Sequence, residues 1–194
     1  GITQRVLAIN FFLNDIYGEQ EIIKHGVIPV DLIQTNPAFL KQMIGFTPPK
    51  KTYNHISGID LIKTNSDNFY VLEDNVRVPS GASYMIENRD TMIKLFPDLI
   101  SRYKVFENRN YANDLSEILK KSSPKKTKKP PNIGLLTPGI YNSAFFEHAF
   151  LADKLGVELV EGKDLRVINK YLNMKTIDGW KRVDVIYRRI DDIF

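Results

Sequence analysis

The chain has 194 residues, of which 43% are hydrophobic and 26% are charged. These proportions are typical of a globular protein with a sizeable core, and they exclude a disordered or fibrous chain. The formal net charge is +4, but residues 120–129 contain six lysines and no acid, which leaves 21 basic and 23 acidic side chains elsewhere.

Several absences narrow the class of protein further. The sequence has no cysteine, which excludes disulfides and thiolate metal sites and fits a reducing cytoplasm. No apolar run approaches the ~20 residues that span a bilayer. The start, Gly1–Arg5, has neither an initiator methionine nor a signal-peptide pattern, and residues 188–194 end in strand-like sequence. We therefore expect a piece of a longer cytoplasmic polypeptide that makes no membrane contact.

The first part of the chain is predicted to hold helices and one β-hairpin. Apolar residues recur at helical spacing in three segments, 6–16, 84–96 and 112–119. Two other apolar runs, 56–62 and 69–72, flank the polar segment 63–68, whose asparagines and aspartates favour a turn. This arrangement predicts a hairpin.

A lysine- and proline-rich segment, residues 120–131, is the predicted boundary between two domains. Its like charges repel one another, and its prolines disfavour both helix and strand. We therefore expect a front domain over 1–119 and a rear domain over 132–194.

The rear domain is predicted to begin with a β-α-β unit. Its parts are a strand over 133–136, a helix over 143–155 closed by Gly156, and a strand over 157–160. A second hairpin is expected from 171–177 and 183–187, turning at Asp178-Gly179. The predicted fold class is α/β with mixed α+β character, with a Rossmann-like rear domain.

Three oxygen-bearing side chains are expected to converge on the first hairpin. Glu73 and Asn75 lie two apart on one strand, so they share a face, and Asp74 points the other way. A turn centred near residue 66 places Asp60 opposite or nearly opposite Glu73. Apolar neighbours flank both acids, so we expect the acids to interrupt buried strands. Two carboxylates and an amide oxygen form a ligand set that suits Mg²⁺.

The spacing of these residues resembles a known family. An Asp followed thirteen positions later by Glu-x-Asn resembles the metal-binding hairpin of ATP-grasp ligases, a superfamily that includes D-alanine–D-alanine ligase and glutathione synthetase. Longer strings resemble the circularly permuted ATP-grasp proteins, relatives of glutathionylspermidine synthase; they are Val71–Gly81, Leu136–Ser143 and Val185–Asp191. The order of parts also indicates permutation, because the hairpin precedes the β-α-β unit instead of following it.

The resemblance implies an ATP-dependent ligase that joins a carboxylate to an amine or a thiol through an acyl phosphate. Asp60, Glu73 and Asn75 correspond to the ligands of Mg²⁺, with Mn²⁺ as a substitute, and Arg77 corresponds to a catalytic cation beside the acyl phosphate. The substrates are ATP and a small carboxylate, amine or peptide. Expected substrate contacts are Ser80, Gly81, Thr137, Gly139, Tyr141, Asn142, Ser143 and Arg188.

Other interpretations of the same residues stay open. Arg77 also fits an ordinary surface arginine, and Ser80 and Gly81 fit a helix cap and a turn. Asn142 or Ser143 also fits a helix cap. The sequence has no Gly-x-Gly and no P-loop, so the part that grips ATP is expected after residue 194. A non-catalytic scaffold that binds a peptide or nucleotide is the alternative function. A nucleic-acid-binding module is not expected, because the lysine segment lacks interleaved aromatic residues.

Overall fold

The computed structural model of the chain describes residues 1–65, 67–103, 105–108, 110–127 and 130–191. Ser66 of the predicted turn, Lys128 and Lys129 of the lysine segment, and residues 192–194 lie outside the described residues. The chain forms two compact units, Gly1–Pro79 and Ser80–Phe194. Within the described ranges, no helix is both long and apolar enough to cross a membrane.

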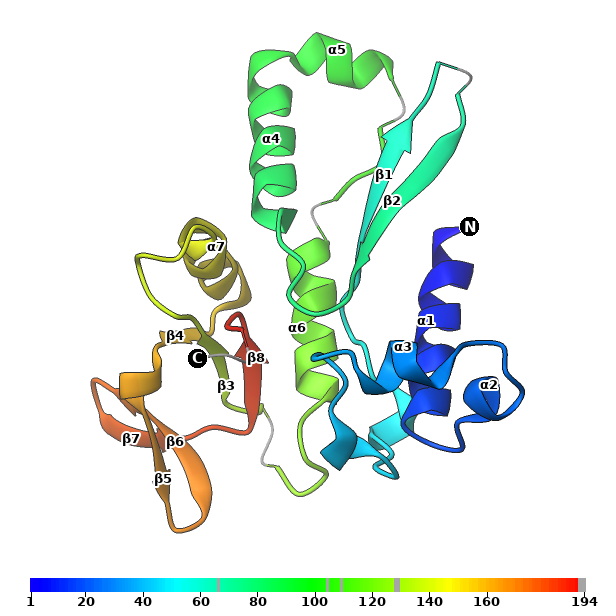
Figure 1. The fold of residues 1–194 in the computed structure, drawn as a ribbon. Coiled ribbons are helices and arrows are strands. Elements are labelled where there is room, and N and C mark those ends of the chain that lie inside the picture. The colour runs from blue at the N-terminus through cyan, green and yellow to red at the C-terminus, as the bar shows by residue number, and fades with distance from the viewer. Residues whose placement is uncertain (66, 104, 109, 128–129, 192–194) are drawn as a thin grey trace. The chain divides into compact units, whose positions relative to one another are not determined.

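The first unit combines short helices with one hairpin (Figure 1). Its elements are α1 (Ile2–Ile16), α2 (Glu21–Lys24), α3 (Val30–Gln34), the 3₁₀ turns Lys41–Met43 and Pro49–Lys51, β1 (Gly58–Lys63) and β2 (Phe69–Asn75). The predicted helix over 6–16 is confirmed by α1. The Asn10 and Asn14 side-chain amides of α1 donate to the Lys51 carbonyl at 3.0 and 2.8 Å, which fixes the second 3₁₀ turn against this helix.

The predicted first hairpin is confirmed, because β1 and β2 pair in antiparallel register. The strands carry exposed apolar side chains, however: Leu61 is 46% exposed and Leu72 is 66% exposed. The expectation that the acids interrupt buried strands is therefore wrong for the described residues. The physical reason is that a two-stranded sheet has little surface with which to bury its side chains; α1 lies close to one of its faces.

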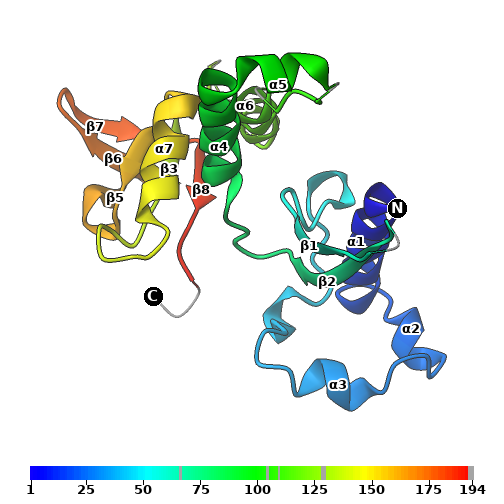
Figure 2. The ribbon, with the colours of Figure 1, turned by 90° about the horizontal axis from the view of Figure 1, so that it is seen from above.

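The second unit has a layer of helices, a parallel sheet and an antiparallel sheet (Figures 1 and 2). The helices are α4 (Ala82–Leu95), α5 (Pro97–Arg102), α6 (Tyr111–Lys121) and α7 (Phe145–Leu155). A parallel sheet in the order β4-β3-β8 contains β3 (Ile133–Leu136), β4 (Glu158–Val160) and β8 (Val185–Arg188). The 3₁₀ turn Gly162–Asp164 leads into an antiparallel sheet of β5 (Leu165–Ile168), β6 (Tyr171–Thr176) and β7 (Gly179–Arg182).

The parallel sheet is covered on both faces, which explains why β3 is an uninterrupted apolar run. Val160 and Met174 belong to the core between this sheet and β5–β7, and Gly134 of β3 faces both of them. Leu135 alternates to the other face and is completely buried. Both α6 and α7 lie close to this sheet. The predicted β-α-β unit is confirmed by β3, α7 and β4, with Gly156 closing α7 in a left-handed conformation.

One expectation for the rear part needs correction. The hairpin that turns before Gly179 is present, but its return strand is β7, and β8 pairs with β3 in the parallel sheet instead. The reason is burial: Val185 and Tyr187 are buried, as expected for a strand of a sheet that is covered on both faces, although β8 lies at its edge. The strand β5 was not predicted.

The division of the chain also differs from the predicted boundary at 120–131. The second unit begins at Ser80, because helices α4 and α6 lie against α7. Leu115 and Leu119 of α6 are buried in this unit, so the chain up to residue 119 does not form one compact front part. The assignment of the ranges 1–119, 120–131 and 132–194 to functional domains stays a prediction.

Candidate active site

The hairpin of the first unit places three oxygen-bearing residues on one face. Asp60 pairs directly with Glu73, and Gly58 pairs with Asn75. Residues paired across strands share a face, and so do residues two apart on one strand. Asp60, Glu73 and Asn75 therefore lie on the same face, and the glycine opposite Asn75 adds no side chain to it.

A β-bulge creates this arrangement. The register shifts between Asp60 and Leu61, so that Leu61 pairs with Val71 while Asp60 pairs with Glu73. Leu72 is the extra residue. In a regular strand without the bulge, Val71 and Glu73 are two residues apart and would point the same way. Leu61 and Val71 line a pocket with α1, so the bulge lets the strand turn its apolar side chains toward α1 and its Glu-x-Asn pair to the opposite face.

Asp74 lies on the face of the hairpin toward α1, as predicted. Its two carboxylate oxygens accept hydrogen bonds from Arg5 Nε at 2.6 Å and Nη2 at 2.5 Å. This bidentate contact holds the pKa of Asp74 below its ordinary value and raises that of Arg5. The two neighbouring acids of β2 therefore have separate surroundings: Asp74 neutralises a helix cation, whereas Glu73 faces away from α1.

The donor set of this face fits a hard divalent cation. Asp60 and Glu73 are exposed and Asn75 is half-buried, so their oxygens are open to a ligand. No group of three or more His, Asp or Glu side chains suited to a metal occurs in the described ranges. The hairpin offers two carboxylates and one amide. Such a partial set suits Mg²⁺, which keeps several water ligands and shares phosphate oxygens with its protein ligands.

Gly58 gives a test of how strictly the end of the hairpin is packed. A Cβ at this position lies 2.7 Å from the Pro79 Cβ, closer than real Cβ contacts. We therefore expect Gly58→Ala to destabilise the first unit by about 1–3 kcal/mol through overpacking. Gly162→Ala is the control, because its Cβ meets nothing within 4 Å. Urea titration of both variants measures the effect, and equal losses contradict the packing argument.

The loop after β3 in the second unit holds several of the other predicted residues. Thr137 follows β3 and is buried; its hydroxyl lies 2.8 Å from His148 Nδ1 and accepts a hydrogen bond from the Gly139 amide at 3.2 Å. Gly139 has φ of +107°, and a Cβ there would lie 3.3 Å from the Glu161 carboxylate. Thr137 and Gly139 thus both make contacts within the fold. A substrate role for these two residues stays a prediction.

A buried ion pair is the feature that sequence reasoning missed. Glu147 and Arg189 have side chains only 2% and 1% exposed, and Arg189 Nη2 donates to Glu147 Oε1 at 2.9 Å. The other oxygen, Oε2, accepts from the Gly81 amide at 2.7 Å and from the Ser83 amide and hydroxyl at 3.1 and 2.9 Å. Glu147 thus occupies the N-terminus of α4, next to Ser80 and Gly81, which were expected to contact substrate.

Two tyrosine hydroxyls, those of Tyr111 and Tyr187, lie near this buried ion pair. Burial is the main cause that raises the pKa of Tyr111 to about 12, and it also raises the pKa of Tyr187. Both phenols are therefore neutral at physiological pH. Arg189 Nη1 lies 3.3 Å from the Tyr187 hydroxyl, so the network links the end of β8 to α7 and to the start of α4.

His148 makes the second unit sensitive to acid. Burial, and after it the Arg189 charge, lowers the pKa of His148 from 6.5 to about 4. The unfolded chain therefore takes up a proton first as the pH falls below about 6.5, and we expect the free energy of unfolding to drop by about 3 kcal/mol by pH 4. His148→Gln should remove this part of the pH dependence in urea titrations, whereas His55→Gln at an exposed position should leave it intact. An unchanged profile for His148→Gln contradicts the assignment.

The remaining predicted residues divide by exposure. Arg77, Ser80, Tyr141, Ser143 and Arg188 are exposed. Asn142 Oδ1 accepts from the Ala144 amide at 2.9 Å and so forms a turn before α7; the helix cap left open for Asn142 is wrong, because the N-cap of α7 is Ala144. Arg188 is exposed and Arg189 is buried, so the two adjacent arginines face opposite ways. The signal for the missed pair was a glutamate in the apolar run 145–152.

Comparison with known proteins places the chain in a family. Residues 1–194 match the family described as a circularly permuted ATPgrasp. The chain belongs to the circularly permuted ATP-grasp family. The predicted family resemblance and the mixed α/β class are thereby confirmed.

Relatives in this family are much longer than the chain. An uncharacterized protein of Synechocystis sp. is 48% identical over 194 residues, covering 100% of this chain and 40% of its own length. An uncharacterized protein of Mycobacterium tuberculosis is also 48% identical, with 35% of its length covered. A Frankia casuarinae protein named "Putative glutamate--cysteine ligase 2-2" is 36% identical over 99% of this chain and 22% of its own length. The chain therefore spans less than half the length of these ATP-grasp relatives.

Proposed function

We propose that the protein containing this chain is an ATP- and Mg²⁺-dependent ligase that forms an amide bond between a carboxylate and an amine. The observation that carries this proposal is the shared face of Asp60, Glu73 and Asn75 on a bulged hairpin. Membership of the ATP-grasp family supports it. The Frankia name describes a whole protein of which the match covers 22%, so it adds support only for the ligase class.

The hairpin residues would hold Mg²⁺, or Mn²⁺ in its place. When bound, the cation neutralises the ATP phosphates, so that an anionic carboxylate approaches the γ-phosphorus. Asp60 and Glu73 supply negative charge to the cation, and Asn75 supplies a neutral oxygen that adds no repulsion toward phosphate. Arg77, two residues further along, is proposed to neutralise the acyl phosphate and the oxyanion formed when the amine attacks.

The substrate contacts are proposed to come from the exposed residues of the predicted set. Tyr141 is 99% exposed, in the loop between β3 and α7, and Ser143 lies in the same loop. Arg188 at the end of β8 offers a guanidinium for a carboxylate. The Gly81 amide and the Thr137 hydroxyl are engaged within the fold, so these two are weaker candidates.

An isotope experiment on the longer polypeptide tests the proposed chemistry. The protein is incubated with ATP, Mg²⁺ and a carboxylate substrate that is labelled with ¹⁸O. Amino acids and short peptides are added one at a time as acceptors. An acyl phosphate leaves one carboxylate oxygen in the released phosphate, so we expect ADP and ¹⁸O-labelled phosphate. Release of AMP and pyrophosphate contradicts the acyl phosphate, and no turnover with any acceptor favours the non-catalytic scaffold.

A further inference from the structure

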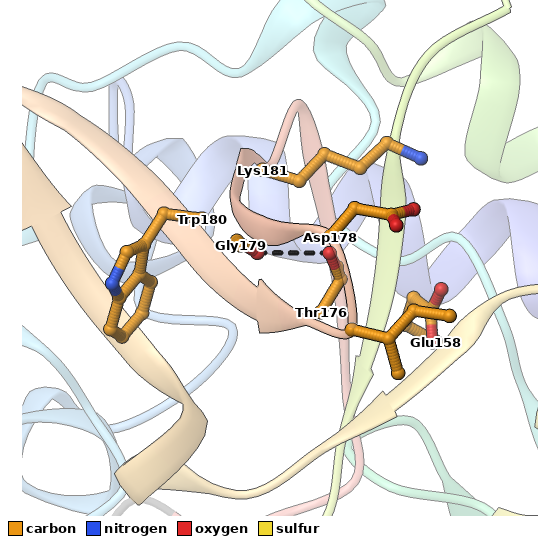
Figure 3. Close-up of a pocket in the computed structure, with 7 residues that line it drawn as sticks. Glu158, Thr176, Asp178, Gly179, Trp180 and Lys181 are labelled. Carbon is orange, nitrogen blue, oxygen red and sulfur yellow. Dashed lines mark hydrogen bonds between the residues drawn. The ribbon is translucent and has the colours of Figure 1, made fainter.

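The antiparallel sheet β5-β6-β7 has one buried and one exposed face. Leu165, Leu172 and Met174 belong to the face that packs against the parallel sheet. Figure 3 shows the end of this sheet, where Trp180 and Lys181 extend to opposite sides of β7. Trp180 therefore lies on the outer face, which neither the parallel sheet nor the proposed catalytic residues use.

The exposed side chains of the outer face are three cations and two aromatic rings, namely Arg166, Tyr171, Lys175, Trp180 and Arg182; Ile168 and the buried Asn173 share this face. The register places Lys175 beside Trp180, and it places Arg166 and Arg182 on either side of Asn173 in the same row. The guanidinium carbon of Arg182 lies 4.0 Å from the ring centre of Tyr171, and that of Arg166 lies 5.9 Å from the ring centre of Trp180. Tyr171 and Trp180 remain 52% and 43% exposed.

The strands of this sheet belong to a second basic segment of the chain. Residues 162–182 contain six lysines and arginines but only two acids, Asp164 and Asp178. Asp164 accepts a hydrogen bond from the Glu161 amide in the turn before β5, and Asp178 lies in the hairpin turn. Asp184 pairs with Arg182 at 3.3 Å. Among the described residues, no carboxylate forms an ion pair with Arg166 or Lys175.

We propose that this outer face of β5–β7 binds single-stranded nucleic acid. Exposed aromatic faces and guanidinium planes stack on unpaired bases, and flanking lysines and arginines pair with phosphates. An acidic peptide has the right charge but offers nothing that stacks on the exposed parts of the two rings, so the rings favour a nucleic acid. Three strands span about 10 Å, which is room for two or three nucleotides. The lysine segment lacked interleaved aromatic residues, whereas this folded face has them.

Trp180 makes the proposal directly measurable, because it is the only tryptophan of the chain. Binding of a twelve-nucleotide oligouridylate to the 194-residue chain should quench Trp180 fluorescence, and the affinity should fall as salt rises from about 50 to about 200 mM. Trp180→Ala, followed by anisotropy of a labelled oligonucleotide, should weaken binding about 5- to 100-fold without changing the salt slope. Arg166→Gln/Lys175→Gln should reduce the slope by about 1.4, since each phosphate contact on a single strand contributes about 0.7.

A matched charge control distinguishes this face from the lysine segment. Lys125→Gln/Lys126→Gln removes two charges outside the sheet and should change the affinity less than about twofold, well below the effect on the sheet. Circular dichroism verifies the fold of each variant. The proposal is overturned if the oligonucleotide does not quench Trp180, or if the lysine-segment variant alone loses binding. A polyglutamate peptide that quenches as strongly as the oligonucleotide also overturns it, in favour of an acidic peptide partner.

Discussion

Replacing Glu147 by alanine is expected to destabilise the second unit by about 3–5 kcal/mol, because it leaves the Arg189 charge buried without its partner. The same change removes the acceptor of the Gly81 and Ser83 amides at the start of α4. Urea denaturation followed by circular dichroism measures the loss. Because 3–5 kcal/mol is a large part of the 5–15 kcal/mol typical of a domain, this variant should unfold at a much lower urea concentration.

A double-mutant cycle separates the ion pair from general damage. Glu147→Ala/Arg189→Ala should cost less than the sum of the two single variants, since the double variant leaves no unpaired charge. Glu158→Ala, at an exposed position of β4, is the control and should change the free energy of unfolding by less than about 0.5 kcal/mol. A Glu147→Ala variant as stable as this control contradicts the role of the buried pair.

The second large effect is expected on catalysis by the longer polypeptide. Glu73→Gln and Asn75→Ala should each lower Mg²⁺-dependent turnover of ATP about 100-fold or more, equivalent to about 2.7 kcal/mol of barrier. The reason is that each variant removes one oxygen ligand from the shared face of the hairpin. Release of ADP with a competent acceptor, measured over a range of Mg²⁺ concentrations, gives the size of the loss.

Asp74→Asn is the matched control for Glu73→Gln. Both variants replace one carboxylate of β2 by an amide, but Asp74 pairs with Arg5 on the opposite face. The control should keep most of its turnover and its dependence on Mg²⁺. Equal losses in Glu73→Gln and Asp74→Asn contradict the proposed site. They would indicate that turnover depends on the total charge of β2 and is independent of the face on which the carboxylate lies.

The sequence predicted local features of the fold well. A turn rich in Asn and Asp between apolar runs predicted β1 and β2, and the pairing of Asp60 with Glu73 lay within the expected range. The bulge at Leu72 was not predicted, because residues 69–72 are all apolar and so hide the shift in alternation that an extra residue causes. The shared face of Asp60, Glu73 and Asn75 nevertheless followed from the two-residue spacing of Glu-x-Asn.

Long-range features were not predictable in the same way. Glu147 and Arg189 lie 42 residues apart, and neither has a local signal beyond a charge beside apolar residues. The pairing of β8 with β3 depends on which apolar run the parallel sheet buries, and periodicity does not choose between partners. The second unit begins at Ser80 because α4 and α6 lie against α7, whereas the lysine segment is only the most polar part of the chain.

The measurement that tests the central claim most directly is paramagnetic broadening of backbone amide signals by Mn²⁺ in the ¹⁵N-labelled chain. A metal site on the hairpin predicts that low Mn²⁺ concentrations broaden the amides of Asp60, Glu73 and Asn75 first. This broadening should disappear in Glu73→Gln and persist in Asp74→Asn. Broadening that is centred elsewhere, or that is unchanged in Glu73→Gln, contradicts the assignment of the metal to this face.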